Sequence, residues 1–147
     1  MRIRDFLGMV RELVGALLPP ERRSFQWRFR FNLLQFYYQD PTIHYEAWVQ
    51  RKTSRIALGL HFEGEREGNY RWAGLLADRL VEIQAQLGSS LELEEWTRSW
   101  TRLHETIPFR TLDESLAEQV AERLAGLMTV LQPILEEERP GIAAEGG

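Results

Sequence analysis

Apolar residues recur every three or four positions in three stretches of the chain, which is the spacing of one buried helix face. These stretches are residues 3–17, 72–87 and 116–134. Asn69 precedes the second stretch as a plausible N-cap, and Gly88 closes it. The third begins at a capping box, Thr111-Leu-Asp-Glu114, in which the two outer side chains satisfy each other's free amides. Three helices are therefore predicted.

Strict alternation of apolar and polar residues marks the strands. It predicts a first strand over residues 25–33, with an extension through residue 38, then strands over residues 43–50 and 56–63. Short polar connections between them favour an antiparallel meander. Residues 91–105 fit either two short strands or a helical stripe that includes Trp96 and Trp100, and we favour the two strands.

The predicted element order is α-β-β-β-α-β-β-α, an α+β fold with an antiparallel sheet of about five strands and helices on one face. The length of 147 residues favours a single domain over residues 1–147. Pro133 is expected to kink or end the last helix, because its ring clashes with the preceding turn. Residues 136–147 are expected to form a frayed tail.

The composition narrows the classes of function. The chain contains no Cys, which excludes disulfides, thiolate metal sites and cysteine nucleophiles and fits a cytoplasmic location. No apolar run is long enough for a transmembrane helix, so no membrane association is expected. Residues 1–20 read as part of the fold and not as a signal peptide, because Arg11 and Glu12 interrupt the apolar stretch.

The overall charge of −4 is unevenly distributed. Residues 1–63 hold ten basic and six acidic residues, a net +4, whereas residues 64–147 hold eight basic and sixteen acidic residues, a net −8. Such an asymmetry indicates either an anion-binding half or solvated acidic faces on the later helices.

Two histidines and two glutamates form the candidate polar-face site. In a strand His44 and Glu46 point to the same side, as do His61 and Glu63, so paired strands would let them converge. Imidazole and carboxylate together suit a divalent metal or a general base. The alternative, which we favour from sequence alone, is a polar sheet face in water, with no metal and no cofactor. His104 stands next to Glu105, which would place those two side chains on opposite faces of a strand.

Two further sets of residues are candidates for binding. Arg28 and Arg30 share a strand face and could bind phosphates or nucleic acid, or pair with Glu46 or Glu63 across the sheet. The apolar face of that strand is expected to belong to the core. Three indoles could line a cavity or a partner interface instead of the core: Trp48, Trp96 and Trp100. The first helix could dock on a partner or be covered within the monomer.

Two resemblances add to this picture. The first is carried by Arg55-Ile-Ala-Leu-Gly-Leu-His-Phe-Glu63, Leu75-Leu76, Ile83, Leu91-Glu-Leu-Glu-Glu-Trp96 and Leu131-Gln-Pro133-Ile. Over residues 43–135 the chain resembles an uncharacterised bacterial domain, some members of which are attached to restriction-type or defence proteins. No catalytic residue carries over from it. The element order is similar to that of secretion-chaperone-like domains, which are dimeric protein-binding modules, although topology alone does not establish function.

The leading prediction is a bacterial, cytoplasmic, non-enzymatic module that binds a protein partner or a second copy of itself. One alternative is a metal-dependent hydrolase or nuclease that uses the His/Glu residues of the polar face. Another is an accessory nucleic-acid-binding protein that uses the Arg-rich first strand. Glycine-rich phosphate loops, nucleophile elbows and acidic calcium loops are absent from the sequence.

Overall fold

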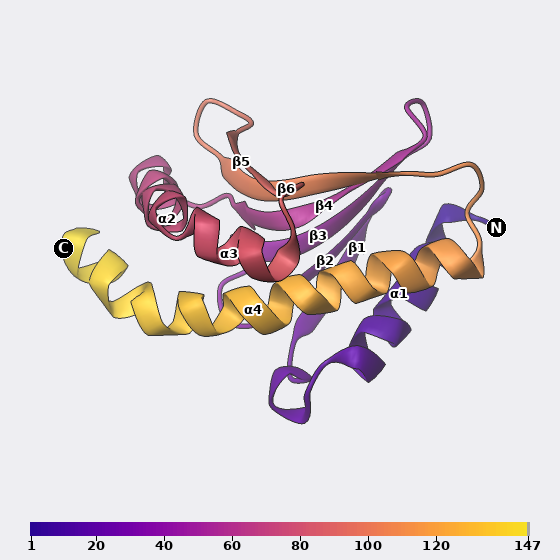
Figure 1. Ribbon diagram of the computed structural model, residues 1–147, viewed down its shortest axis with the longest axis horizontal. Coiled ribbons are helices and arrows are strands. Elements are labelled where there is room, and N and C mark those ends of the chain that lie inside the picture. Colours follow the sequence, from indigo (N-terminus) through magenta and orange to yellow (C-terminus); the bar gives the residue numbers. More distant parts are fainter. Residues whose placement is uncertain (147) are drawn as a thin grey trace.

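A six-stranded antiparallel sheet in the order β1-β2-β3-β4-β6-β5 forms the centre of the computed structural model, which describes residues 1–146 (Figure 1). The strands are β1 (Gln26–Arg30), β2 (Leu33–Tyr37), β3 (Ile43–Gln50), β4 (Arg55–Phe62), β5 (Glu92–Glu95) and β6 (Thr101–Pro108). The helices are α1 (Ile3–Leu17), α2 (Arg66–Asp78), α3 (Leu80–Leu87) and α4 (Glu114–Gly146), with a short 3-10 turn at Pro20–Arg22. The fold is α+β.

The first predicted strand is in fact two. The chain reverses at Phe31 and Asn32, so that Arg30 pairs with Leu33 across a two-residue hairpin. Phe31 adopts a positive φ of 53°, a conformation normally left to Gly, Asn or Asp. The alternation of apolar and polar residues continues through this turn, so the sequence pattern does not reveal it. The sheet therefore has six strands instead of about five.

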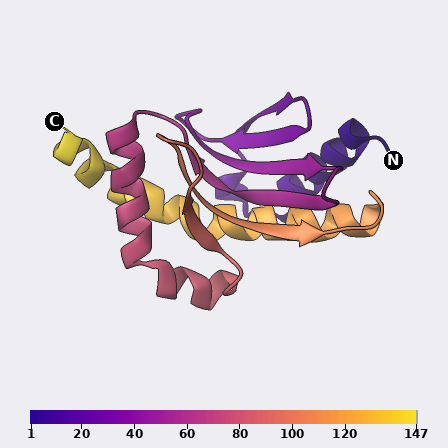
Figure 2. The same cartoon turned by 90° about the horizontal axis from the view of Figure 1, so that it is seen from above.

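The helices cover one face of the sheet, and Figure 2 shows α4 running beneath the strands. The alternating residues Tyr45, Ala47 and Val49 of β3 are buried on this face, with their counterparts in β4. Burial of each large apolar side chain contributes about 1.5–3 kcal/mol, so this layer is the main source of stability. None of the helices within residues 1–146 is both long and apolar enough to cross a membrane.

Helix α1 is covered within the monomer. Its apolar stripe packs against α4 and β2, and Phe6, Leu7, Val10 and Val14 are fully buried. The stripe is therefore not available as a docking surface.

The apolar face of the first predicted strand is only partly buried, although it was expected to belong to the core. Trp27 is 43% exposed and Phe31 is 97% exposed, so neither is a core residue. Arg11 of α1 lies over the Trp27 ring, with its guanidinium carbon 4.3 Å from the ring centroid.

The boundaries of the later helices differ from the prediction. Asn69 lies inside α2 and does not cap it, and the predicted second helix breaks at Arg79 into α2 and α3. In the last helix the capping group is Asp113, whose carboxylate accepts the backbone N–H of Leu116 at 2.9 Å. The expected Thr111–Glu114 box is thus replaced by a cap one residue before the helix.

Helix α4 continues through Pro133 to Gly146, so residues 136–146 are helical where a frayed tail was expected. The side chains of Leu131, Ile134 and Leu135 on either side of the proline are buried in the core. Packing on the sheet thus holds the helix together where the backbone loses one hydrogen bond. Residue 147 lies outside the described residues.

Candidate metal centre and pocket

The face of the sheet opposite the helices carries the His/Glu residues. In the β3–β4 register His44 lies directly opposite His61, and Glu46 lies opposite Gly59. Glu63 follows β4 directly, and its backbone N–H donates to the carbonyl of Thr42 at 2.8 Å, which prolongs the ladder by one step. The pleat and the register thus bring both predicted pairs to one place.

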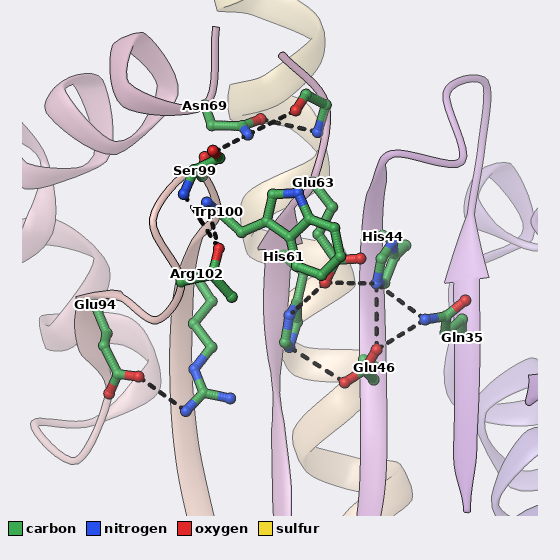
Figure 3. A network of polar contacts seen from close by, with 12 residues as sticks. Gln35, His44, Glu46, His61, Glu63, Asn69, Glu94, Ser99, Trp100 and Arg102 are labelled. Atoms are coloured by element: carbon green, nitrogen blue, oxygen red, sulfur yellow. Dashed lines mark hydrogen bonds and ion pairs between the residues drawn. The ribbon is translucent and has the colours of Figure 1, made fainter. Parts of the chain in front are cut away.

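The four side chains form a compact cluster (Figure 3). His44 Nε2 lies 3.2 Å from Glu46 Oε1 and 3.8 Å from Glu63 Oε2. His61 Nε2 lies 3.6 Å from Glu46 Oε2, and His61 Nδ1 lies 3.3 Å from Glu63 Oε2. The two imidazoles are stacked, with ring centroids 5.4 Å apart. Each carboxylate therefore faces both imidazoles.

The cluster is buried, which overturns the expectation of a polar face in water. His44, Glu46 and His61 are all less than 5% exposed, and the Glu63 side chain is 17% exposed. Buried ionisable groups require partners that neutralise their charge. The prediction of no metal assumed that these side chains are solvated, and their burial removes that assumption.

Hydrogen bonding fixes the orientation of one imidazole. His44 Nδ1 lies 3.0 Å from the carbonyl oxygen of Pro41, which can only accept, so Nδ1 carries a proton. In the neutral imidazole the Nε2 lone pair then points at the carboxylates. A nitrogen lone pair and two carboxylates that face one another need a cation between them, either a proton or a metal ion.

One ring nitrogen of His61 lacks a hydrogen bond. Its Nδ1 atom is buried and makes no hydrogen bond within the described residues, although Glu63 Oε2 is close by. Buried polar atoms without a hydrogen bond are uncommon and call for an explanation, such as a bound ion. The geometry therefore leaves room for a ligand bond at this nitrogen.

Electrostatics keep Glu46 ionised. Burial by itself would raise the pKa of this carboxyl group, but when the imidazoles are protonated a hydrogen bond from His44, the charge of His61 and a hydrogen bond from Gln35 together lower it to about 2. The carboxylate is therefore available as a metal ligand or as the counter-ion of the imidazoles.

Two residues outside the cluster orient it. Gln35 Nε2 donates to Glu46 Oε1 at 2.8 Å and lies 3.2 Å from His44 Nε2. The other end of the same amide accepts a hydrogen bond from Arg28 Nε, which fixes which way the amide faces. Such supporting contacts are characteristic of metal ligands. Arg28 thus acts through Gln35, and not by the direct pairing with Glu46 or Glu63 that the sequence suggested.

The donor set and its spacing fit a divalent transition metal. One ligand atom from each of His44, Glu46, His61 and Glu63 can be chosen so that all four lie within 4.8 Å of one another. An ion bound at about 2.1 Å places neighbouring ligand atoms about 3.0–3.4 Å apart, so small side-chain shifts complete the site. Two imidazole nitrogens with two carboxylates suit Zn²⁺, Mn²⁺ or Fe²⁺ better than Ca²⁺.

A pocket of about 370 Å³ opens onto the cluster. Glu46, Glu63 and Gln35 line it on the side of the sheet, while Arg30 and Phe31 line it from the β1–β2 hairpin. The three indoles that were predicted to line a cavity or an interface all belong to this pocket or its edge: Trp48, Trp96 and Trp100 line it together with Asn32 and Leu33. The two carboxylates of the cluster are therefore reachable through a pocket lined by aromatic side chains.

The β5–β6 loop closes one side of the pocket. Trp96 meets the His61 ring edge-on at 5.6 Å, and its backbone N–H donates to the Trp100 carbonyl at 3.1 Å. Asn69 is 3% exposed and ties this loop to the end of β4: its amide donates to the carbonyls of Ser99 and Gly64 and accepts the Gly64 N–H (Figure 3). One buried side chain thus holds the loop beside Glu63.

The third histidine lies outside the cluster. His104 Nε2 pairs with Glu94 of β5 at 2.9 Å, while burial and the neighbouring Arg102 lower its pKa. Glu105 points to the helix side, where it accepts hydrogen bonds from Arg123 and Ser90. The expected opposite orientation of this pair is what the structure shows.

Gln35 and Asn69 are the site residues that sequence reasoning missed. Gln35 is the one polar residue in Leu33–Tyr37, a signal that becomes readable only once the hairpin at Phe31 is known. Asn69 was assigned to a cap because its contacts lie five and thirty residues away. Comparison of the chain with models of protein families, with curated proteins and with solved structures finds no match to any of them.

Proposed function

We propose that the protein binds one divalent transition-metal ion through His44, Glu46, His61 and Glu63 and uses it for hydrolysis in the adjoining pocket. The observation that carries the proposal is the convergence of these four side chains, three of them buried, beside a pocket that the two carboxylates line. Four protein ligands leave open positions in a six-coordinate site. A bound ion lowers the pKa of water to about 7 and so supplies hydroxide near neutral pH.

The charges of the site support the same conclusion. The two ionised carboxylates balance an ion of charge +2, and the imidazoles bind it as neutral ligands. The buried cluster therefore carries no net charge when the ion is bound. Glu63 lines the pocket and is the more exposed of the two carboxylates. Its free oxygen is suited to take the proton of the attacking water.

The test compares histidines inside and outside the cluster. Chelator-treated protein is titrated with Zn²⁺ or Mn²⁺ by calorimetry, using the wild type, His44→Gln, His61→Gln and the control His104→Gln. We expect one ion per chain in the wild type and the control, and none at micromolar metal in the two cluster variants. Absence of binding in the wild type, or equal binding in all four proteins, would overturn the metal site.

Hydrolysis is tested separately on the loaded protein. Aryl acetates and bis(p-nitrophenyl) phosphate report on ester and phosphodiester cleavage, with Glu63→Gln as a variant that keeps the shape of the side chain. We expect metal-dependent turnover that Glu63→Gln reduces by at least tenfold, within the range of general-base effects. A loaded wild type with no turnover on any activated ester would reject hydrolysis and leave the metal site standing.

A second proposal keeps the protein-interaction function and the dimer predicted from the sequence. It is favoured by the exposed aromatic residues Trp27 and Phe31 on the β1–β2 hairpin, where β1 forms one edge of the sheet. Exposed apolar side chains at an unpaired edge favour association. Light scattering during size-exclusion chromatography should show a dimer that dissociates more readily in Phe31→Ser. A wild type that is monomeric at millimolar concentration would contradict this second proposal.

A further inference from the structure

The lining of the pocket suits one chemical class of ligand. Four of its ten lining residues are aromatic, and the carboxylates Glu46 and Glu63 line it on the side of the cluster. Arg30 is the one cationic side chain among the lining residues that the structure describes. A volume of about 370 Å³ lies at the small end of ligand sites and fits a compound of one or two rings.

The sign of the ligand charge follows from the metal. In the loaded site the ion cancels the two carboxylates, so Arg30 leaves the lining with a net charge of +1. Without the ion, and with neutral imidazoles, the same lining has a net charge of −1. A loaded pocket therefore favours an anion, and a metal-free pocket would favour a cation between its indoles.

We infer that the metal-loaded pocket binds a small aromatic monoanion, of which an aromatic carboxylate is the simplest case. Its ring lies against the indoles, and its charged group approaches the ion and Arg30. This inference rests on the proposed metal site. It also agrees with the proposed reaction, since hydrolysis of an aromatic ester consumes one water and yields an aromatic carboxylate, an alcohol and a proton.

The β1–β2 hairpin forms one wall of the pocket that would hold this ligand. Phe31 holds a left-handed backbone conformation although its side chain has almost no packing to stabilise it there. Such strain is typically retained where a residue contacts a ligand. Phe31 and Arg30 stand together on the hairpin, so the same turn supplies one aromatic and one cationic contact.

The probe is 2-naphthoate, followed by calorimetry and by quenching of tryptophan fluorescence. Matched probes change one property each: 2-naphthamide removes the charge, 2-naphthylmethylammonium reverses it, and acetate removes the rings. We expect zinc-loaded protein to bind 2-naphthoate at least tenfold more tightly than the amide or acetate. Arg30→Gln should weaken the binding of 2-naphthoate by about tenfold and leave the affinity for 2-naphthamide unchanged.

Zinc content is measured in the same samples, which separates the two possible failures. One zinc per chain with equal affinity for the anion and the amide would overturn the ligand class and leave the metal site intact. No zinc in the wild type would reject the metal site, and the inference with it. Tighter binding of the ammonium probe than of the anion to loaded protein would also overturn the inference. Trp48→Leu provides a second variant, expected to weaken all ring-bearing probes and to leave zinc content unchanged.

Discussion

Replacement of Glu46 by Gln tests whether the cluster works by charge. The pKa of this carboxyl group falls from an ordinary 4.5 to about 2. Each pH unit corresponds to about 1.4 kcal/mol, so the surroundings favour the ionised form by roughly 3 kcal/mol. The amide of Glu46→Gln still accepts a hydrogen bond from Gln35, but it carries no charge to set against His44 and His61.

We therefore expect Glu46→Gln to lower the free energy of unfolding by about 2–3 kcal/mol in chelator at pH 6. For a chain of this length that corresponds to a fall in Tm of roughly 4–12 °C. The control is Glu95→Gln, which changes an exposed carboxylate at the end of β5 and should shift stability by less than about 0.5 kcal/mol.

The pH dependence supplies an independent check on the sign. Because the folded-state pKa lies below that of the unfolded chain, the unfolded chain takes up the proton first as the pH falls. The stabilising contribution of Glu46 is then complete above about pH 4.5 and is lost as the pH approaches 2. The gap between the wild type and Glu46→Gln should shrink to about half or less at pH 3.

Urea unfolding of the three proteins at pH 6 and pH 3, in chelator, measures these differences. Equal stability of the wild type and Glu46→Gln at pH 6 would refute the charge argument. So would a gap of the same size at both pH values, because a cavity or packing defect does not titrate. With Zn²⁺ at about 100 times its Kd the wild type should gain about 2.7 kcal/mol, and Glu46→Gln should gain far less.

Three further substitutions test the surrounding framework. Asn69→Ala removes three hydrogen bonds that join the β5–β6 loop to Gly64; a loss of about 2–3 kcal/mol in urea and a red shift of tryptophan emission are expected, and unchanged emission would argue against the clamp. Tyr45→Phe removes the buried 3.0 Å hydrogen bond to Gln132 and should cost about 1–2 kcal/mol in the same assay; a neutral effect would mean that the amide finds another partner. Phe31→Asn relieves the left-handed strain at an exposed site and should raise the free energy of unfolding by about 0.5–1 kcal/mol, whereas a fall in Tm would contradict the strain argument.

Periodicity was sufficient for the central strands. The alternation of β3 and β4 predicted which side chains share a face, and short polar links predicted that the strands pair. The same pattern failed at Phe31, because a two-residue hairpin keeps the alternation going and this one lacks the usual Gly, Asn or Asp at its positive-φ residue. The alternation of β4 also gives no sign that residue 59 must be glycine: a Cβ there would clash with the Leu103 carbonyl oxygen, a contact that only the paired strand creates.

The amino-acid sequence alone therefore determined the fold class, the faces of the main strands and the four residues able to share a site. These depend on local pattern, because neighbouring residues in a strand alternate sides whatever lies around them. Only the tertiary structure decided that the site is buried. Its supporting contacts come from other segments of the chain: the Gln35 amide contacts His44 from the neighbouring strand, and Trp96 meets the His61 ring from the β5–β6 loop that Asn69 clamps. Burial is a property of those distant contacts, and it changes four polar side chains from a solvated surface into a candidate metal centre.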